Sequence, residues 1–272
     1  MSAPRHDRSV PGLPPGALIG MVHLAALPGS PHSSRAVAEI AAEAAREARL
    51  LAESGFDAIL VENMHDRPYL RREVGPETVA AMAVATAAVR EAVACPVGVQ
   101  VLAGANVEAL AICVATGATF LRAEGFAYAS VADEGLFGEA DAARLLRRRR
   151  ELGATGVAIL ADIRKKHSSH AITSDLSLGD LAEGCAFCGA DAVVVTGSAT
   201  GHPTSAEDLA AARQGGPLPV VVGSGADTAS VRALLEQADA IVVGSSIKRD
   251  GHWANPVDPA RARAFVQAAR GG

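Results

Sequence analysis

The chain has 272 residues, of which 49% are apolar and 20% are charged, and 25 Lys and Arg against 30 Asp and Glu give a net charge of −5. This composition can bury a large core, which excludes a wholly disordered chain, and its mildly acidic balance offers no general footprint for nucleic acid or a membrane surface. Four cysteines are too few for a disulfide framework, so we expect a reducing compartment.

The first sixteen residues contain four prolines and several charges, but no apolar stretch of signal-peptide length. We therefore expect a flexible leader over residues 1–16, followed by one domain over residues 17–272. No window of the chain reaches the roughly 18 consecutive apolar residues of a membrane span. These features predict a cytoplasmic protein without membrane contact.

Short apolar runs rich in Val and Ile alternate along the chain with Ala-rich stretches of helical period. Continuous apolarity is typical of strands buried on both faces, as in parallel sheets. The expected strands are Ala17–Val22, Ala58–Glu62, Val97–Leu102, Thr119–Ala123, Gly156–Ile163, Ala192–Thr196, Leu218–Val222 and Ala240–Val243. The expected helices are Arg35–Ser54, Glu77–Ala94, Val107–Thr116, Ala140–Leu152, Leu178–Cys188, Ala206–Arg213, Thr228–Gln237 and Pro259–Ala269.

Eight strands and eight helices in strict alternation predict an α/β fold, a (β/α)8 TIM barrel in a single domain. A doubly wound sheet is the rival architecture. Its dinucleotide-binding variant needs G-x-G-x-x-G after the first strand, whereas here the segment from His23 to Ser30 reads HLAALPGS. The pattern therefore favours the barrel.

Functional groups of such a barrel gather at the carboxyl ends of its strands and in the loops that follow. Asp162, which ends a fully apolar run, is the leading catalytic candidate, because a carboxylate beside other titratable groups serves proton transfer. The other catalytic candidates at strand ends are Glu62, Glu124, Lys166 and His167. The candidates for substrate binding are His23, Asn63, Gln100, Arg122, Thr196, Gly197 and Lys248. For the charged run after Asp162, the alternative interpretation is a solvated loop.

Glycine and serine recur after the last two expected strands. Gly223, Ser224 and Gly225 follow the seventh strand, and Gly244 and Ser245 follow the eighth. Glycines let backbone N–H groups approach an anion closely, and a phosphate site built from loops 7 and 8 recurs in this class of barrel. Tight turns are the alternative, but Gly-Ser in both loops favours a phosphate site.

Metal ligands and redox cysteines are less well supported. Glu62, Asp162, His23 and His167 could converge on the barrel axis, but no typical metal-ligand spacing occurs, so we expect neither a metal nor a cofactor. The C-x-x-C of Cys185 and Cys188 lies in a helical pattern without a second pair. We interpret these two cysteines as small buried residues.

Several of these segments together resemble the signature of the BtpA/SgcQ family, from about Gly20 to Val266. The matching segments are Gly20–Leu24 with Leu27–Pro31, Val61–Pro68, Ala161–Asp162 with Lys166–His167, Val195–Gly197 with Thr200–Gly201, Val222–Gly225, and Val243–Gly251 with Asn255–Asp258. The resemblance implies a barrel of the ribulose-phosphate-binding type. The family name derives from a proposed role in photosystem I biogenesis, and other members look like enzymes of sugar or nucleoside metabolism.

The chain departs from the family pattern at two strand ends. Ala103–Asn106 stands where the family usually has an Arg-Asn-Asp-like segment, and Arg122-Ala123-Glu124 stands in place of Arg-Val-Asn. These departures indicate an altered substrate or altered chemistry on that side of the pocket.

The sequence therefore predicts an enzyme that acts on a phosphorylated sugar or a nucleotide-like small molecule. Loops 7 and 8 hold the phosphate, and acid–base groups act at the pentose, in cleavage or transfer at the glycosidic carbon or in isomerase or lyase chemistry. A non-catalytic assembly or regulatory factor of the photosystem I biogenesis type and a metal-dependent hydrolase are the alternatives. The partners we expect are the phosphorylated substrate and a second copy of the chain in a homodimer.

Overall fold

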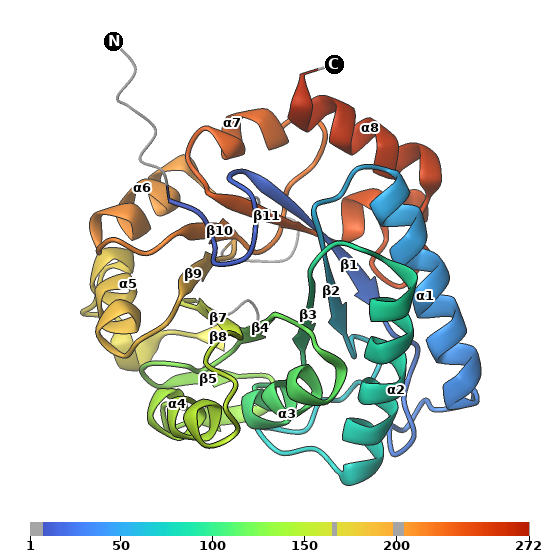
Figure 1. Ribbon diagram of the computed structural model, residues 1–272. Helices are drawn as coiled ribbons and strands as arrows, with labels where there is room; N and C mark the ends of the chain where they lie inside the picture. The colour runs from blue at the N-terminus through green and yellow to red at the C-terminus, as the bar shows by residue number, and fades with distance from the viewer. Residues whose placement is uncertain (1–7, 165–167, 198–203, 272) are drawn as a thin grey trace.

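The computed structural model describes residues 8–164, 168–197 and 204–271. Within these ranges, eight parallel strands close into a barrel in which β1 pairs with both β2 and β11 (Figure 1). The barrel strands are β1 (Ala17–His23), β2 (Ala58–Glu62), β3 (Val97–Gln100), β4 (Phe120–Ala123), β7 (Ala158–Asp162), β9 (Ala192–Val195), β10 (Val220–Val222) and β11 (Ala240–Val243). The predicted single-domain (β/α)8 barrel is confirmed.

Helices form a ring outside the strands (Figure 1). Their bounds are α1 (Val37–Glu53), α2 (Pro76–Ala92), α3 (Asn106–Thr116), α4 (Ala142–Glu151), α5 (Leu178–Phe187), α6 (Ala206–Gln214), α7 (Val231–Leu235) and α8 (Pro259–Arg270). Short 3-10 turns occur at η1 (Ala171–Thr173), η2 (Ser245–Ile247) and η3 (Arg249–Gly251). Local sequence explains several helix starts, since the side chains of Ser177, Ser205 and Asp258 cap α5, α6 and α8.

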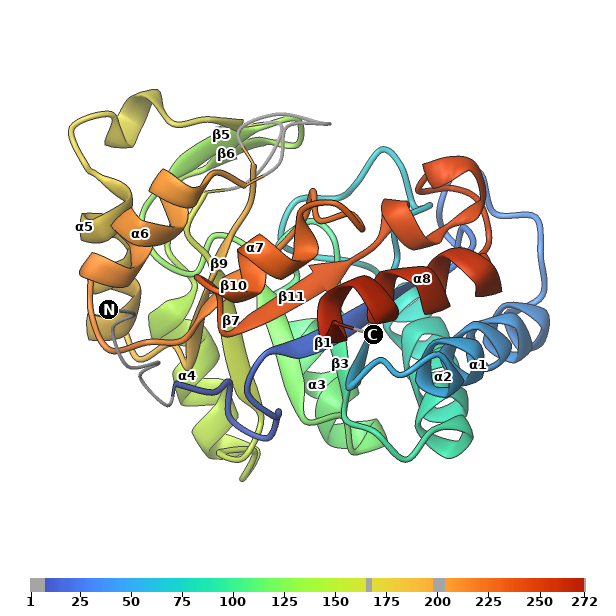
Figure 2. The same ribbon diagram turned by 90° about the horizontal axis from the view of Figure 1, so that it is seen from above.

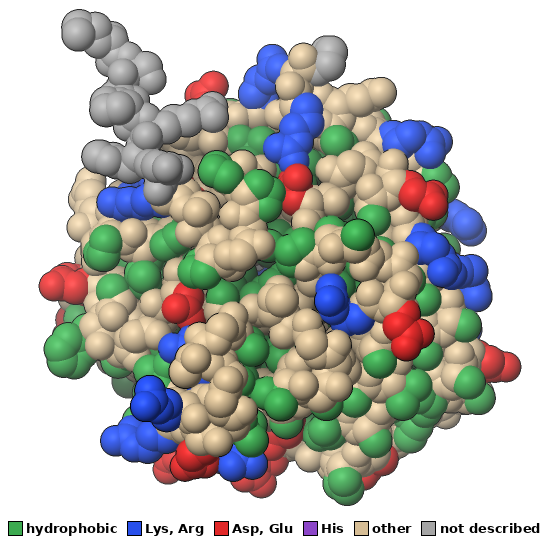
Figure 3. All heavy atoms as spheres, viewed as in Figure 1, with side chains coloured by type: hydrophobic (Ala, Val, Ile, Leu, Met, Phe, Trp, Pro, Cys, Tyr) green, Lys and Arg blue, Asp and Glu red, His purple; other side chains and the backbone are tan. Residues whose placement is uncertain are grey.

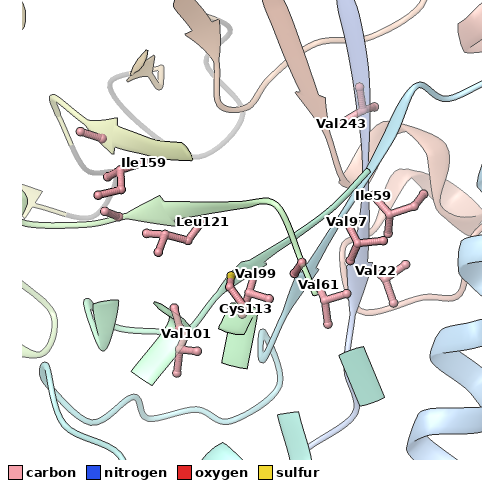
Figure 4. Close-up of a cluster of buried hydrophobic side chains, with 14 of the residues drawn as sticks. Val22, Ile59, Val61, Val97, Val99, Val101, Cys113, Leu121, Ile159 and Val243 are labelled. Atoms are coloured by element: carbon pink, nitrogen blue, oxygen red, sulfur yellow. The ribbon is translucent and has the colours of Figure 1, made fainter. Parts of the chain in front are cut away.

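The barrel strands divide their side chains between two apolar layers, because successive strand residues point to opposite faces. One layer packs between strands and helices and includes Val22, Ile59, Val61, Val99 and Leu121 (Figure 4). The other layer fills the barrel interior with Ile19, Met21, Leu60, Leu160 and Val242, among others. The continuous apolar runs in the sequence thus correspond to strands buried on both sides.

The barrel interior is filled at one level by an aromatic ring. Phe120 of β4 is fully buried, and a Cβ atom added to Gly98 of β3 would lie 2.1 Å from the Phe120 Cε2. No larger residue therefore fits at position 98 while the ring stays in place.

A small antiparallel sheet lies outside the predicted pattern. β5 (Ser130–Ala132) pairs with β6 (Gly135–Phe137) and with β8 (Ser168–Ser169), so that it joins the loops after β4 and β7. Figure 2 shows β5 and β6 beyond the ends of the barrel strands. A cavity of about 30 Å³ between this sheet and the barrel is lined by Tyr128 and Ser130 on one side and by Asp162 on the other.

Part of the expected leader packs against the barrel. Val10 and Leu13 are buried in the same interior layer as Ala17 and Ile19. Residues 1–7 lie outside the described ranges, so the leader as a whole stays a prediction. None of the helices in the described parts of the chain has the length and apolar character needed to cross a membrane.

Candidate functional site

The inward-facing side chains at the carboxyl ends of the barrel strands line one end of the barrel, which we call the mouth. Along each strand, every second side chain points into the barrel. Two residues after the last interior residue of the core, the next inward-facing residue lies at the carboxyl end of the strand. The residues at that level are His23, Glu62, Gln100, Arg122, Asp162, Thr196, Gly223 and Gly244. All eight are residues that the sequence predicts for the site. They meet at the mouth because each lies an even number of residues from the inward-facing residues of its strand.

His23 and Glu62 face each other at the ends of β1 and β2. The His23 Nε2 lies 3.5 Å from a Glu62 carboxyl oxygen, and the His23 Nδ1 lies 3.0 Å from the backbone oxygen of Trp253. A carbonyl only accepts hydrogen bonds, so Nδ1 carries the proton and Nε2 presents its lone pair to Glu62. Burial, reinforced by the charge of Lys248, lowers the pKa of His23 to about 3, so the contact joins a neutral ring to a carboxyl group.

Glu62 titrates near neutral pH. Burial raises its pKa to about 7 against the opposing effect of Arg122, and the nearby charges of Glu124 and Asp162 raise it further. A carboxyl group with such a pKa can both donate and accept a proton at neutral pH. The raised pKa of Glu62 is that of a group able to transfer protons at neutral pH, and its catalytic role stays a prediction.

Arg122 and Asp162 form a buried pair between β4 and β7. The Arg122 Nε lies 3.2 Å from each Asp162 oxygen, and Nη2 lies 3.0 Å from Oδ1. The same guanidinium donates through Nη1 to the backbone oxygen of Gly223, at 3.3 Å. Asp162 thus orients an arginine that contacts loop 7, the loop that follows β10. The sequence does not reveal this role.

Gly223 is explained by this close packing. A Cβ atom at position 223 would lie 2.5 Å from Val194 Cγ1, 2.8 Å from Thr196 Cγ2 and 3.1 Å from Arg122 Nη2. Thr196 also donates through Oγ1 to the backbone oxygen of Arg164, at 2.6 Å, and Gly197 beside it is buried. Loops 6 and 7 are therefore packed closely against the strand that carries Asp162.

Loops 7 and 8 contain hydrogen-bond donors that have no acceptor among the described residues. The backbone N–H groups of Gly225, Gly244 and Ser245 donate no hydrogen bond within the described part of the chain. The hydroxyl oxygens of Ser224 and Ser246 are shielded from solvent, and they too have no hydrogen-bond partner among the described residues. Ser246 was not among the predicted phosphate-binding residues. Only its place next to Ser245 in the loop could have indicated it.

Glu124 and Gln100 complete the polar side of the mouth. Both are buried, and the Gln100 Oε1 has no hydrogen-bond partner among the residues that the structure describes. The backbone oxygen of Glu124 accepts from Asn106 Nδ2, which also donates to Asp141, and Asp141 pairs with Arg72. This network was not predicted, because its members lie in three separate loops and helix ends.

Asn63 is committed to holding loops together. Its Oδ1 accepts from the backbone N–H of Leu102, and its Nδ2 donates to Asp66, whose other oxygen accepts from the backbone N–H of Leu27. Both ends of the amide are thereby used to connect loops 1, 2 and 3. The substrate-binding role predicted for Asn63 stays a prediction, and the geometry favours a positioning role.

Lys248 is buried at the end of loop 8, where its Nζ lies 3.3 Å from Glu47 Oε2 of α1. Burial lowers the pKa of Lys248, and the carboxylate of Glu47 opposes that shift. The other Glu47 oxygen accepts from the backbone N–H of Val257. This pair ties loop 8 to the outer helix, so substrate binding by Lys248 stays a prediction.

Two further catalytic candidates, Lys166 and His167, lie outside the described residues, as do Thr200 and Gly201 of the family signature. In the parts of the chain that are described, no three or more His, Cys, Asp or Glu side chains lie together as metal ligands would.

The fold and the mouth define a (β/α)8 barrel with polar and titratable groups at the carboxyl ends of its strands. The BtpA family model matches residues 15–271, and the chain belongs to this family. An uncharacterised mitochondrial protein of Caenorhabditis elegans is 41% identical over 92% of this chain and 91% of its own length. The photosystem I biogenesis protein BtpA of Synechocystis sp. is 37% identical over 92% of this chain and 87% of its own.

Among solved structures, N-(5'-phosphoribosyl)anthranilate isomerase from Pyrococcus furiosus is similar in fold. It is 15% identical, with a TM-score of 0.57 over 94% of this chain and 100% of that one. At this level of identity the likeness establishes the barrel architecture alone.

Proposed function

We propose that this protein is an enzyme that acts on a phosphorylated sugar or a nucleotide-like molecule, with acid–base chemistry at the pentose. The observation that carries the proposal is Glu62, a buried carboxyl group with a pKa of about 7 at the barrel mouth, against a neutral His23. Carboxyl groups with raised pKa values are typical general acids of glycosidic chemistry.

In this mechanism the phosphate is bound by loops 7 and 8. The free backbone N–H groups of Gly225, Gly244 and Ser245 and the hydroxyl groups of Ser224 and Ser246 are its donors. The phosphoribosyl substrate named for the structurally similar isomerase agrees with such a ligand, although the two chains share only the fold.

Glu62 in its protonated form donates its proton to the leaving group as the bond between that group and the pentose C1 breaks. A water molecule, or the acceptor in a transfer reaction, then bonds to C1 and returns a proton to the Glu62 carboxylate. Glu124 supplies a second carboxyl group beside the positive charge that develops on the sugar ring. Isomerase or lyase chemistry would use the same proton transfer at a neighbouring carbon.

The ligand is tested by thermal unfolding in the presence of phosphorylated pentoses and nucleotides. A compound at 100 times its dissociation constant adds about 2.7 kcal/mol to the free energy of unfolding. We expect this stabilisation in the wild type and its loss in Gly225→Val, because φ at Gly225 is +79°, which a β-branched residue rarely adopts. Absence of a shift with every phosphorylated compound, or an equal shift in the variant, would contradict the phosphate site.

The name of the Synechocystis relative favours a second candidate, an assembly factor that acts through a protein partner. Glu62→Gln separates the two functions. An assembly role survives the loss of one buried acid–base group at the mouth, whereas turnover of a sugar phosphate does not. A metal-dependent hydrolase remains the third candidate, which metal analysis of protein purified without chelators tests directly.

The homodimer and the cytoplasmic location stay predictions. Sedimentation of the purified protein measures the first, and fractionation of the source cells measures the second. The word mitochondrial in the name of the Caenorhabditis elegans relative makes the second measurement necessary.

A further inference from the structure

A groove of about 380 Å³ lies on the outer surface between α1 and α8. Arg46 and Arg49 of α1 and Arg263 of α8 line it, together with Leu50, Glu53 and Pro259. In Figure 3 basic side chains are seen along the right-hand edge of the molecule, where α1 lies in the same view of Figure 1.

The lining of the groove carries an excess of positive charge, since three arginines face one glutamate there. Arg46, Arg49 and Arg263 make no ion pair and no side-chain hydrogen bond among the described residues, and Glu53 is the one acidic residue in the lining. Other arginines next to the same two helices do have partners: Arg35 pairs with Glu43, Arg270 pairs with Asp57, and Arg261 donates to the backbone oxygen of Ser246.

Two acidic residues of α1 near these arginines have other partners, and a third, Glu53, lies in the groove lining with no ion pair among the described residues. Glu43 is paired with Arg35, and both oxygens of Glu47 are occupied by Lys248 and the backbone of Val257. Arg46 and Arg49 are three residues apart on one helix, so their like charges lie side by side and repel each other. A bound anion would relieve this repulsion in a chain whose net charge is −5.

We propose that the groove binds a small polyphosphate anion, of the class of a nucleoside di- or triphosphate. A guanidinium group can donate two parallel hydrogen bonds to the oxygens of one phosphate. Arginines therefore favour a phosphate over a monatomic anion such as chloride. The volume is that of a site for a small molecule, and Leu50 and Pro259 supply an apolar surface for a base or sugar. This site lies on the helical ring and is separate from loops 7 and 8.

Isothermal titration calorimetry with ATP, and with tripolyphosphate as an anion without a base, tests the proposal. We expect a saturable site that is present in the wild type and also in Gly225→Val, in which binding at loops 7 and 8 is removed. The double variant Arg49→Gln/Arg263→Gln should bind at least about tenfold more weakly, because two charge-assisted donors are lost. The matched control, Arg147→Gln/Arg150→Gln on α4, removes the same charge from exposed positions elsewhere and should keep the wild-type affinity.

Both pairs of arginines are exposed, so both double variants should fold, and circular dichroism melts verify this. Gly225→Val distinguishes the groove from the barrel mouth, and its affinity for tripolyphosphate should equal that of the wild type. Three results would overturn the proposal: no saturable binding in the wild type, wild-type affinity in Arg49→Gln/Arg263→Gln, or an equal loss in the α4 control.

Discussion

Both carboxylate oxygens of Asp162 lie 3.2 Å from the Nε of Arg122, and the same guanidinium donates to the backbone oxygen of Gly223. Asp162 therefore acts on loop 7 through Arg122. The sequence presents Asp162 as the leading catalytic carboxylate, and that role stays a prediction. Its pairing with Arg122 favours a positioning role for the loop that we propose binds phosphate.

Asp162→Asn should leave the Arg122 charge buried without its counter-charge. We expect a loss of about 3–5 kcal/mol in the free energy of unfolding, together with weaker binding of ribose 5-phosphate. Urea unfolding and calorimetry measure the two quantities. Asp191→Asn is the control, because Asp191 pairs with Arg149 away from the mouth, so this change should lower stability and leave phosphate affinity unchanged. A stable Asp162→Asn protein with normal affinity and greatly reduced turnover would support the catalytic assignment.

Glu62→Gln should preserve the fold and phosphate binding while lowering turnover by about a hundredfold or more. The wild-type rate should fall as the pH rises through about 7, because the general acid is active in its protonated form. This limb of the pH–rate profile should be absent in the variant. A rate that rises through the same pH range would contradict the assignment of Glu62 as the acid.

The raised pKa of Glu62 also affects stability. The folded protein binds this proton with a pKa of about 7, against an ordinary pKa of 4.5 for a glutamate in the unfolded chain. The contribution is therefore fully present below about pH 4.5 and is lost as the pH rises through about 7, by up to about 3 kcal/mol. Urea unfolding of the wild type and Glu62→Gln between pH 4.5 and 8 should show the variant gaining stability relative to the wild type as the pH increases. A constant difference would show that Glu62 has an ordinary pKa.

Gly223→Ala should force loop 7 away from β9, since the added methyl group would lie within 2.8 Å of Val194 and Thr196 side-chain atoms. We expect a loss of about 1–3 kcal/mol in stability and weaker binding of phosphorylated ligands. Gly156→Ala is the matched control, because nothing lies within 4 Å of a Cβ atom at that position. Similar stabilities for the two variants would contradict the close packing described for loop 7.

Asn63→Ala should destabilise the protein by about 1–3 kcal/mol, because the buried N–H of Leu102 loses its acceptor. If Asn63 only connects loops, the Michaelis constant should change little once the protein is folded. Asn255→Ala, which removes an exposed amide bonded to the Arg249 backbone, is the control and should be nearly neutral. A large increase in the Michaelis constant without a loss of stability would instead support the substrate-binding role.

The barrel could be predicted from the sequence because its strands are continuous apolar runs and its helices are amphipathic. The same period-two register carries His23, Glu62, Arg122 and Asp162 to the mouth, so the residues that line the mouth could also be predicted. Pairings between these residues were not. Whether Asp162 meets Arg122 or a residue of its own loop depends on side-chain directions that strand spacing does not encode.

Features built from irregular segments were missed for a related reason. β5 and β6 are each three residues long and β8 is two residues long, which is too short for an alternating pattern to be recognised. The contact of Glu47 with Lys248 joins positions 201 residues apart in the chain. Local sequence patterns contain no signal for such a contact.

Closure of the barrel joins the two ends of the chain, because Ala17 of β1 pairs with Ala240 of β11. During synthesis, a chain that has not yet reached Ala240 leaves the hydrogen-bonding edges of β1 and β10 open. Open edges of apolar strands are templates for aggregation, so the growing chain is vulnerable until its last strand emerges. A premature stop before β11 should therefore yield insoluble fragments, even though Glu62 and Glu124 have already been made.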